Sequence, residues 1–91
     1  MKYKLIGNEL YIARKVVLTD KETKVLNAFL TFKEISLDDL CKVTRLNAFF
    51  TRQIIQNINR KTGWFITIVR TTFNQENRFE ITYKLKVKGE D

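Results

Sequence analysis

The sequence from Asn47 to Gly63 reads Asn-Ala-Phe-Phe-Thr-Arg-Gln-Ile-Ile-Gln-Asn-Ile-Asn-Arg-Lys-Thr-Gly. Its apolar residues recur at the helical period and form a single stripe: Phe50, Ile54, Ile55 and Ile58. Asn47 is a good N-cap, and Gly63 favours the end of a helix. We therefore predict an amphipathic helix over residues 47–62 that buries this stripe.

The opposite face of this helix carries side chains suited to nucleic acid. A rotation of about 100° per residue gathers them on one side: Phe49, Arg52, Gln53, Gln56 and Arg60, with Asn59 at the border. Arg, Gln and Asn side chains hydrogen-bond base edges in a major groove. The stretch also holds Lys61 and no acid. It favours a DNA-reading face, and an ordinary solvated helix face is the alternative.

The length and composition indicate one small globular domain. The chain has 91 residues, of which 44% are hydrophobic and 30% charged, and this is enough for one modest core. No apolar run reaches the roughly 20 residues that a membrane-spanning helix needs. The N-terminus lacks a signal-peptide pattern. We expect a cytoplasmic protein with no membrane partner.

The cysteine and histidine content argues against a metal site and against common enzyme chemistry. Cys41 is the single cysteine and the sequence contains no histidine, so an internal disulfide and a structural zinc site are not expected. The usual general base and the Ser-His or Cys-His nucleophile pairs are also missing. We therefore expect a binding protein rather than an enzyme, with no metal and no cofactor.

The positive charge is concentrated in two segments. The formal net charge is +7, to which residues 1–18 and 47–63 contribute +3 each, whereas residues 19–46 are neutral. Such a distribution suggests a polyanionic partner, and nucleic acid before a membrane surface.

The N-terminal part predicts a small antiparallel sheet over about residues 3–18. Apolar residues alternate on both sides of Gly7-Asn8, a dipeptide suited to a tight turn. Thr19 or Asp20 then caps a helix, and Ser36 caps another after a break at residues 33–35. These two helices are expected over about residues 20–33 and 37–43.

After Gly63 the period changes from helical to alternating. Residues 64–73 are rich in β-branched and aromatic side chains, and residues 74–77 form a polar turn. The return strand places its apolar residues on one side: Phe79, Ile81, Tyr83, Leu85 and Val87. We expect a β-hairpin over about residues 64–87. Trp64 and the phenylalanines could stack on bases, but their spacing favours core packing.

The segment Leu40–Asn47 reads Leu-Cys-Lys-Val-Thr-Arg-Leu-Asn and joins two predicted helices by a short turn. With the buried positions of the next helix and the basic hairpin after it, this order resembles the winged helix-turn-helix superfamily of DNA-binding domains. Two residues depart from the family pattern. Arg45 stands where glycine commonly allows a left-handed turn, and Thr44 replaces an apolar residue.

The resemblance covers essentially the whole chain and implies a single α+β domain over residues 1–91. Its parts would be short N-terminal antiparallel strands, a three-helix bundle and a C-terminal β-hairpin wing. The subfamily is open. Strands that lead into residues 18–22 look like response-regulator output domains, whereas residues 63–66 and 77–81 look like MarR-type regulators.

In this superfamily the third helix enters the major groove, and the hairpin lies along the backbone or the minor groove. The resemblance thus implies a recognition helix over residues 47–62 whose base-reading residues are Asn47, Phe49, Arg52, Gln53 and Gln56. It implies backbone contacts for Arg70 and Arg78 at the wing, and for Lys2, Lys4, Arg60 and Lys61.

Three functions agree with these features. The first is sequence-specific binding of double-stranded DNA by a small transcriptional regulator, which acts alone, as a homodimer or as a fragment of a larger protein. The second is a winged-helix module for protein–protein assembly, although such domains usually lose the basic recognition helix. The third is a plasmid or phage replication or partition protein that binds DNA without regulating transcription. The basic, acid-free segment 47–63 favours the first.

Overall fold

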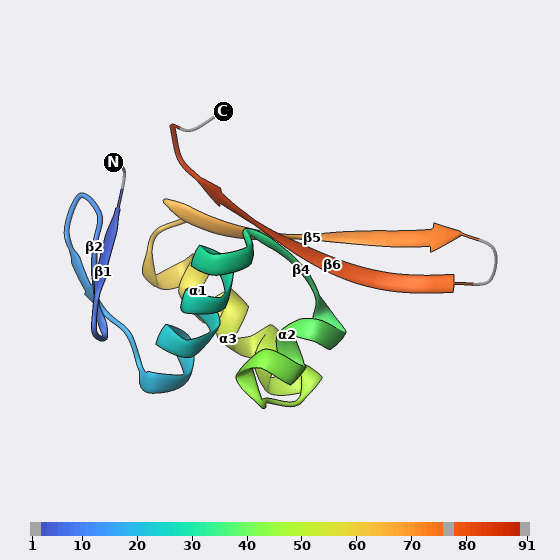
Figure 1. Ribbon diagram of the computed structural model, residues 1–91. Helices are drawn as coiled ribbons and strands as arrows, with labels where there is room; N and C mark the ends of the chain where they lie inside the picture. Colours follow the sequence, from blue (N-terminus) through green and yellow to red (C-terminus); the bar gives the residue numbers. More distant parts are fainter. Residues whose placement is uncertain (1–2, 76–77, 90–91) are drawn as a thin grey trace.

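The computed structural model describes residues 3–75 and 78–89, with the side chains of residues 73–75, 78 and 79 left out. Along these residues it contains three helices and six strands (Figure 1): β1 Lys4–Ile6, β2 Glu9–Tyr11, β3 Lys15–Val17, α1 Asp20–Phe32, β4 Glu34–Ser36, α2 Leu37–Thr44, α3 Ala48–Lys61, β5 Ile66–Gln75 and β6 Arg78–Val87. The α+β class expected from the sequence is confirmed.

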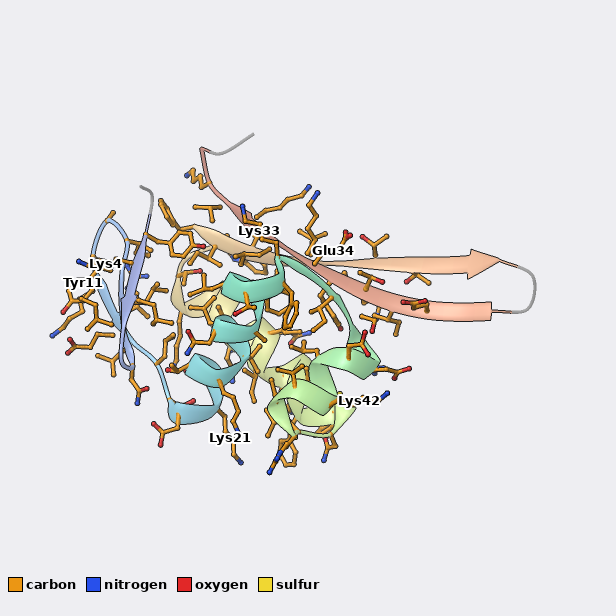
Figure 2. All side chains as sticks on the ribbon, in the orientation of Figure 1. Lys4, Tyr11, Lys21, Lys33, Glu34 and Lys42 are labelled. Atoms are coloured by element: carbon orange, nitrogen blue, oxygen red, sulfur yellow. The ribbon has the colours of Figure 1, made fainter. Side chains whose placement is uncertain are left out.

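The strands form two antiparallel sheets. β1, β2 and β3 pair in that order, and the second sheet has the order β4-β6-β5. The N-terminal sheet lies at one end of the molecule, and the β5–β6 hairpin extends past the helices at the other end (Figure 1). Figure 2 shows the same separation, with Lys4 and Tyr11 on the N-terminal sheet and Glu34 and Lys42 towards the opposite side.

Strand β4 corrects the sequence-based prediction, which treats residues 33–35 as a break. Ile35 pairs with Tyr83 of β6, and both side chains are buried. The Lys33 carbonyl also accepts a hydrogen bond from the Leu85 N–H at 2.9 Å. A strand of three residues is too short to show a period, and its register is set by a partner far along the chain.

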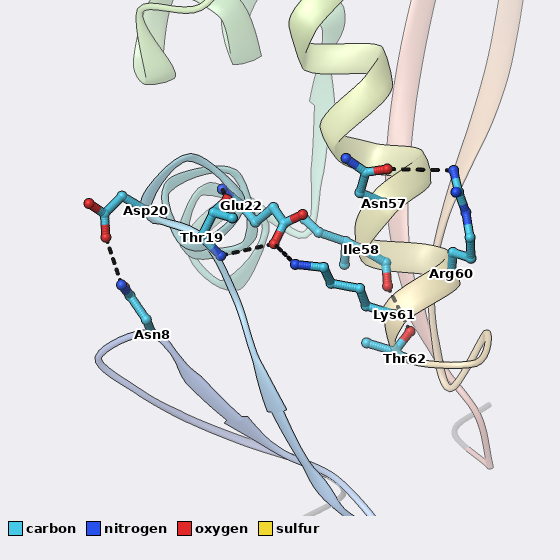
Figure 3. Close-up of polar contacts among 9 residues, drawn as sticks. All are labelled: Asn8, Thr19, Asp20, Glu22, Asn57, Ile58, Arg60, Lys61 and Thr62. Carbon is cyan, nitrogen blue, oxygen red and sulfur yellow. Dashed lines mark hydrogen bonds and ion pairs between the residues drawn. The ribbon is translucent and has the colours of Figure 1, made fainter.

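The turn of the N-terminal hairpin joins this sheet to α1. Gly7 has a φ of 57°, a conformation that favours glycine. The Asn8 side-chain amide donates to Asp20 Oδ1 at 2.6 Å, and the Asn8 backbone carbonyl accepts from the Leu18 N–H at 2.8 Å. The first of these contacts is drawn in Figure 3. The sheet is therefore fixed at the start of the first helix.

Helix α1 supplies the centre of the core. The Thr19 hydroxyl accepts from the Glu22 N–H at 3.2 Å, and the Glu22 carboxylate accepts from the Thr19 N–H at 2.9 Å, which completes a capping box. Val25, Leu26 and Phe29 have no exposed surface, and α1 contacts both other helices. Burial of each such side chain contributes about 1.5–3 kcal/mol, so this stripe holds the three helices together.

The turn between α2 and α3 contains a left-handed residue and a buried threonine. Arg45 adopts the left-handed conformation, with φ 59° and ψ 34°. Thr44 is fully buried, and its hydroxyl donates to the Leu40 carbonyl at 2.7 Å. The predicted N-cap is present, because Asn47 Oδ1 accepts from the Phe50 N–H at 2.8 Å.

The buried stripe of α3 differs from the predicted one at its first turn. Phe50 is 47% exposed, whereas Thr51 has no exposed surface. The buried residues are Thr51, Ile54, Ile55, Ile58 and Asn59. Phe50 lies about 100° around the helix from Thr51, and this rotation places its ring outside the core. The ring instead meets Lys21, whose Nζ is 5.5 Å from the ring centroid.

The end of α3 is tied to strand β5 by buried polar side chains. Asn59 Oδ1 accepts from the Ile68 N–H at 2.8 Å, and Asn59 Nδ2 donates to the Ile68 carbonyl at 3.3 Å. The Thr62 hydroxyl donates to the Ile58 carbonyl at 3.0 Å and accepts from the Ile66 N–H at 3.3 Å. These contacts fix the direction in which the hairpin leaves the helix.

The inner face of the β5–β6 hairpin packs on the helices, as the alternation predicts. Ile66, Ile68, Tyr83 and Val87 are buried, and Ile81 and Leu85 are partly buried against the core. The side chain of Phe79 lies outside the described residues. Arg70 pairs with Tyr83 across the hairpin. Arg70 is two residues after Ile68 in β5, so its side chain lies on the same face of the strand, the one turned to the helices.

Replacing Asn59 by alanine should destabilise the protein. Two backbone groups of Ile68 would lose their buried partners, and each unsatisfied group costs about 1–3 kcal/mol. The free energy of unfolding, measured with urea, should fall by about 2–4 kcal/mol. Asn57→Ala in the same helix is the control and should change it by about 0.5 kcal/mol or less. Equal effects of the two variants would contradict the proposed role of Asn59.

Candidate nucleic-acid interface

The outer face of α3 is exposed as the sequence predicts. Phe49 is 64% exposed and meets the Phe50 ring edge-on, with the ring centroids 5.9 Å apart. The four polar or charged residues predicted for this face are also exposed: Arg52, Gln53, Gln56 and Arg60. Asn59, at the border, is buried and bonded to β5. The exposed face thus combines amide, guanidinium and aromatic side chains.

Asn47 is less available for a partner than the sequence suggests. Its Oδ1 accepts from the Phe50 N–H and stabilises the first turn of α3. The side-chain amide is the group that could still donate to a base. Asn47 is exposed at the start of α3, beside the outer face of the helix. Its hydrogen bond to the Phe50 N–H, however, serves to cap the helix.

A groove lies between α3 and β5 and brings together residues from both elements. Its volume is about 320 Å³, and its lining residues are Arg52, Ile55, Gln56, Asn59, Trp64, Ile68, Arg70 and Tyr83. Ile55, Ile68 and Tyr83 are almost completely buried and form an apolar floor. Arg52, Gln56 and Arg70 are exposed. Arg52 and Gln56 of α3 therefore share one groove with the hairpin residue Arg70.

The groove is positively charged. Its lining contains two arginines and no acid. No ion pair joins Arg52 or Arg70 to another residue in the described ranges 3–75 and 78–89. On its other side Arg52 borders a separate hollow that Asp38 and Glu80 also line. Because two guanidinium groups lack an acidic partner within the described part, the groove is suited to bind an anion.

Trp64 lines the groove, although its spacing in the sequence favoured a position in the core. It is 59% exposed rather than part of the core. Its φ of 66° is unusual for a bulky residue, and its backbone is fixed on both sides. The Trp64 N–H donates to the Asn59 carbonyl at 2.9 Å, and the Thr67 hydroxyl donates to the Trp64 carbonyl at 3.0 Å. The indole ring is therefore attached to a fixed backbone. In the sequence, the one feature that could have indicated its exposure is its position directly after Gly63.

Lys61 forms an internal ion pair (Figure 3). Its Nζ lies 2.6 Å from Glu22 Oε1, and the two side chains are 39% and 4% exposed, respectively. The Lys61 carbonyl also accepts a hydrogen bond from Arg14 at 2.7 Å. Lys61 thus connects α3 to α1 and to the loop before β3, and its charge is already compensated.

The other residues that were expected to contact the DNA backbone lie in different parts of the chain. Arg60 is exposed, and its guanidinium approaches Asn57 Oδ1 at 3.5 Å (Figure 3). Lys4 is exposed on the N-terminal sheet and does not line the groove. Lys2 and the side chain of Arg78 lie outside the described residues. Of these expected contacts, Arg70 is therefore the hairpin residue that the structure places beside α3.

Neither a metal site nor a membrane helix is found in the described part of the chain. Residues 3–75 and 78–89 contain no group of three or more His, Cys, Asp or Glu residues that could hold a metal ion. Within the same ranges, none of the helices has the length and apolar composition to cross a membrane.

Comparisons with protein-family models, with curated proteins and with solved structures gave no match for this chain.

The neighbours Arg60 and Lys61 should respond differently to substitution. Lys61→Met would leave the buried Glu22 carboxylate without its cation. Hydrogen bonds to charged groups contribute about 1.5–3 kcal/mol, and because Lys61 is partly exposed, solvent screening lowers the expected loss of unfolding free energy to about 1 kcal/mol. Arg60→Met should change it by less than about 0.5 kcal/mol. Chemical denaturation of both variants tests this, and an unchanged stability of Lys61→Met would show that the pair is not structural.

Proposed function

We propose that this chain binds double-stranded DNA, with α3 in the major groove and the β5–β6 hairpin along the backbone. The observation that carries the proposal is the convergence of Arg52 and Gln56 of α3 with Arg70 of the hairpin on one groove. One element supplies groups that recognise base edges, and the other supplies a cation beside them. This division of contacts is the one that the winged helix-turn-helix resemblance implies.

The dimensions of α3 support this placement. The helix has 14 residues, which corresponds to about 21 Å of length. A helix of about 10–12 Å diameter fits the major groove, which is about 12 Å wide. Arg52 and Gln56 are one turn apart, so their Cβ atoms are about 5–6 Å from each other. Both side chains could therefore reach neighbouring base pairs, and the exposed Phe49 could contact a thymine methyl group.

The proposed biological role is that of a small transcriptional regulator. The face of α3 offers side chains that discriminate bases, and such discrimination is what a regulator requires. A replication or partition protein would use the same face, so binding experiments test the shared activity first. The winged helix-turn-helix assignment is part of the proposal. It is supported by the left-handed turn at Arg45 and by the hairpin that follows α3.

Assembly with another protein is the second candidate function, and one hollow favours it. This hollow has a volume of about 600 Å³ and is lined by Phe32, Glu34, Ile35, Ser36, Asp39, Lys42, Val43, Glu80 and Thr82. Phe32 and Val43 are 52% and 50% exposed. Three acids and one lysine line it, so it suits a protein surface better than a polyanion.

Binding to duplex DNA should depend strongly on salt. Each phosphate neutralised by the protein makes the slope of log K against log salt more negative by about 0.9. Arg70→Gln should therefore make this slope less negative by about 1. The control Lys24→Gln removes an exposed cation of α1 that does not line the groove, and it should leave the slope unchanged. Fluorescence anisotropy with labelled duplex provides the measurement. An affinity that stays flat between low and physiological salt would exclude the proposed function.

The helix variants should change sequence preference, and the hairpin variant should not. An arginine or glutamine that bonds a base edge provides about 1–3 kcal/mol of discrimination. Arg52→Ala and Gln56→Ala should each relax the preference at one base pair, whereas Arg70→Ala should weaken specific and random DNA alike. Binding-site selection on the wild type and these variants, with the fold checked by circular dichroism, measures this. An identical preferred site in both helix variants would show that α3 is not the reading element.

A further inference from the structure

We propose that the groove between α3 and β5 also binds one unpaired nucleotide of a single nucleic-acid strand, with its base stacked on Trp64. This site goes beyond duplex binding, because a base inside a duplex has both faces covered by its neighbours. The inference stands on the groove alone and does not require the duplex proposal to be correct.

The groove offers separate surfaces for the parts of a nucleotide. The 59% exposed indole of Trp64 supplies an aromatic wall, and every base has a face that can stack on it. Arg52 and Arg70 supply positive charge for the flanking phosphates. Gln56 supplies an amide that can both donate to and accept from a base edge. A phosphate by itself would use the two arginines but would leave the exposed indole without a partner.

The floor of the groove fits a flat, largely apolar group. Ile55, Ile68 and Tyr83 line it and are at most 4% exposed. Asn59 also lines the groove, but its Nδ2 and Oδ1 are each already hydrogen-bonded to the Ile68 backbone. The volume of about 320 Å³ lies at the lower end of the range of about 300–1,000 Å³ that is typical of small-ligand pockets.

The fixed backbone of Trp64 makes it a suitable stacking surface. Both its N–H and its carbonyl are hydrogen-bonded within the protein, and Asn59, whose carbonyl accepts from the Trp64 N–H, is itself hydrogen-bonded to Ile68 of β5. The loss of backbone freedom is therefore already complete before a ligand binds, which favours affinity. Among the side chains that the structure describes, the other exposed aromatic residues do not combine these features. Phe49 and Phe50 pack against each other, Phe32 lines the acidic hollow, and the Tyr11 hydroxyl donates to Glu9 on the N-terminal sheet.

Trp64 is the single tryptophan of the chain, so its fluorescence reports directly on this groove. The first experiment titrates the wild-type protein with an oligothymidylate, whose bases stack weakly on one another. We expect saturable quenching of the Trp64 emission as bases stack on the indole. Binding detected by anisotropy without any change in this emission would overturn the proposal, and so would the absence of binding.

The second experiment compares variants by the anisotropy of a labelled oligothymidylate. Trp64→Ala should weaken binding about 10-fold or more, since base–aromatic stacking has this magnitude. Trp64→Phe keeps an aromatic face and should retain most of the affinity. Phe32→Ala is the matched control, because it removes a similarly exposed aromatic residue outside the groove. Equal affinities for Trp64→Ala and the control would contradict the role of Trp64.

A parallel titration with a blunt duplex separates this inference from the proposed function. Duplex binding without oligothymidylate binding would refute the single-strand site and leave the duplex proposal intact. Oligothymidylate binding with Trp64 quenching, but without duplex binding, would support the single-strand site and refute the duplex proposal. Thymidine monophosphate provides a third arm. If it quenches as strongly per site as the oligonucleotide, the groove binds free nucleotides, and the proposal of a strand-binding site is wrong.

Discussion

Asn59 makes two hydrogen bonds to the backbone of Ile68, and this buried contact sets the geometry of the candidate interface. It joins the last turn of α3 to β5, while Thr62 closes the intervening turn. Buried polar groups are costly when unpaired, so the two elements have one favourable arrangement. In that arrangement Arg70 of the hairpin lies beside the exposed face of α3.

The molecule consequently presents surfaces of different character. The groove between α3 and β5 contains arginines, an amide and an exposed indole. The larger hollow beside β4 combines exposed apolar groups with acids such as Glu34 and Asp39. A polyanion is attracted to the first surface and repelled by the acids of the second. DNA binding and protein assembly would therefore use different parts of the chain.

Local features of the sequence predicted the helices and the exposed face of α3, because caps and periods involve near neighbours. Asn47 caps α3 as expected. The predictions that were wrong or missing concern features that depend on tertiary contacts. The exchange of Phe50 for Thr51 in the core reflects where α3 meets α1 and α2, and the exposure of Trp64 depends on the turn into β5. Strand β4 and the position of Arg70 beside α3 arise from pairing between distant segments.

We propose that the exposed face of α3 and the adjoining part of β5 contact DNA. Chemical-shift mapping of the ¹⁵N-labelled protein during titration with duplex DNA tests it most directly. The largest amide shifts should fall on residues 48–60 and around Arg70, with small changes beside Phe32 and Val43. Shifts confined to the hollow beside β4 or to the N-terminal sheet would contradict the claim.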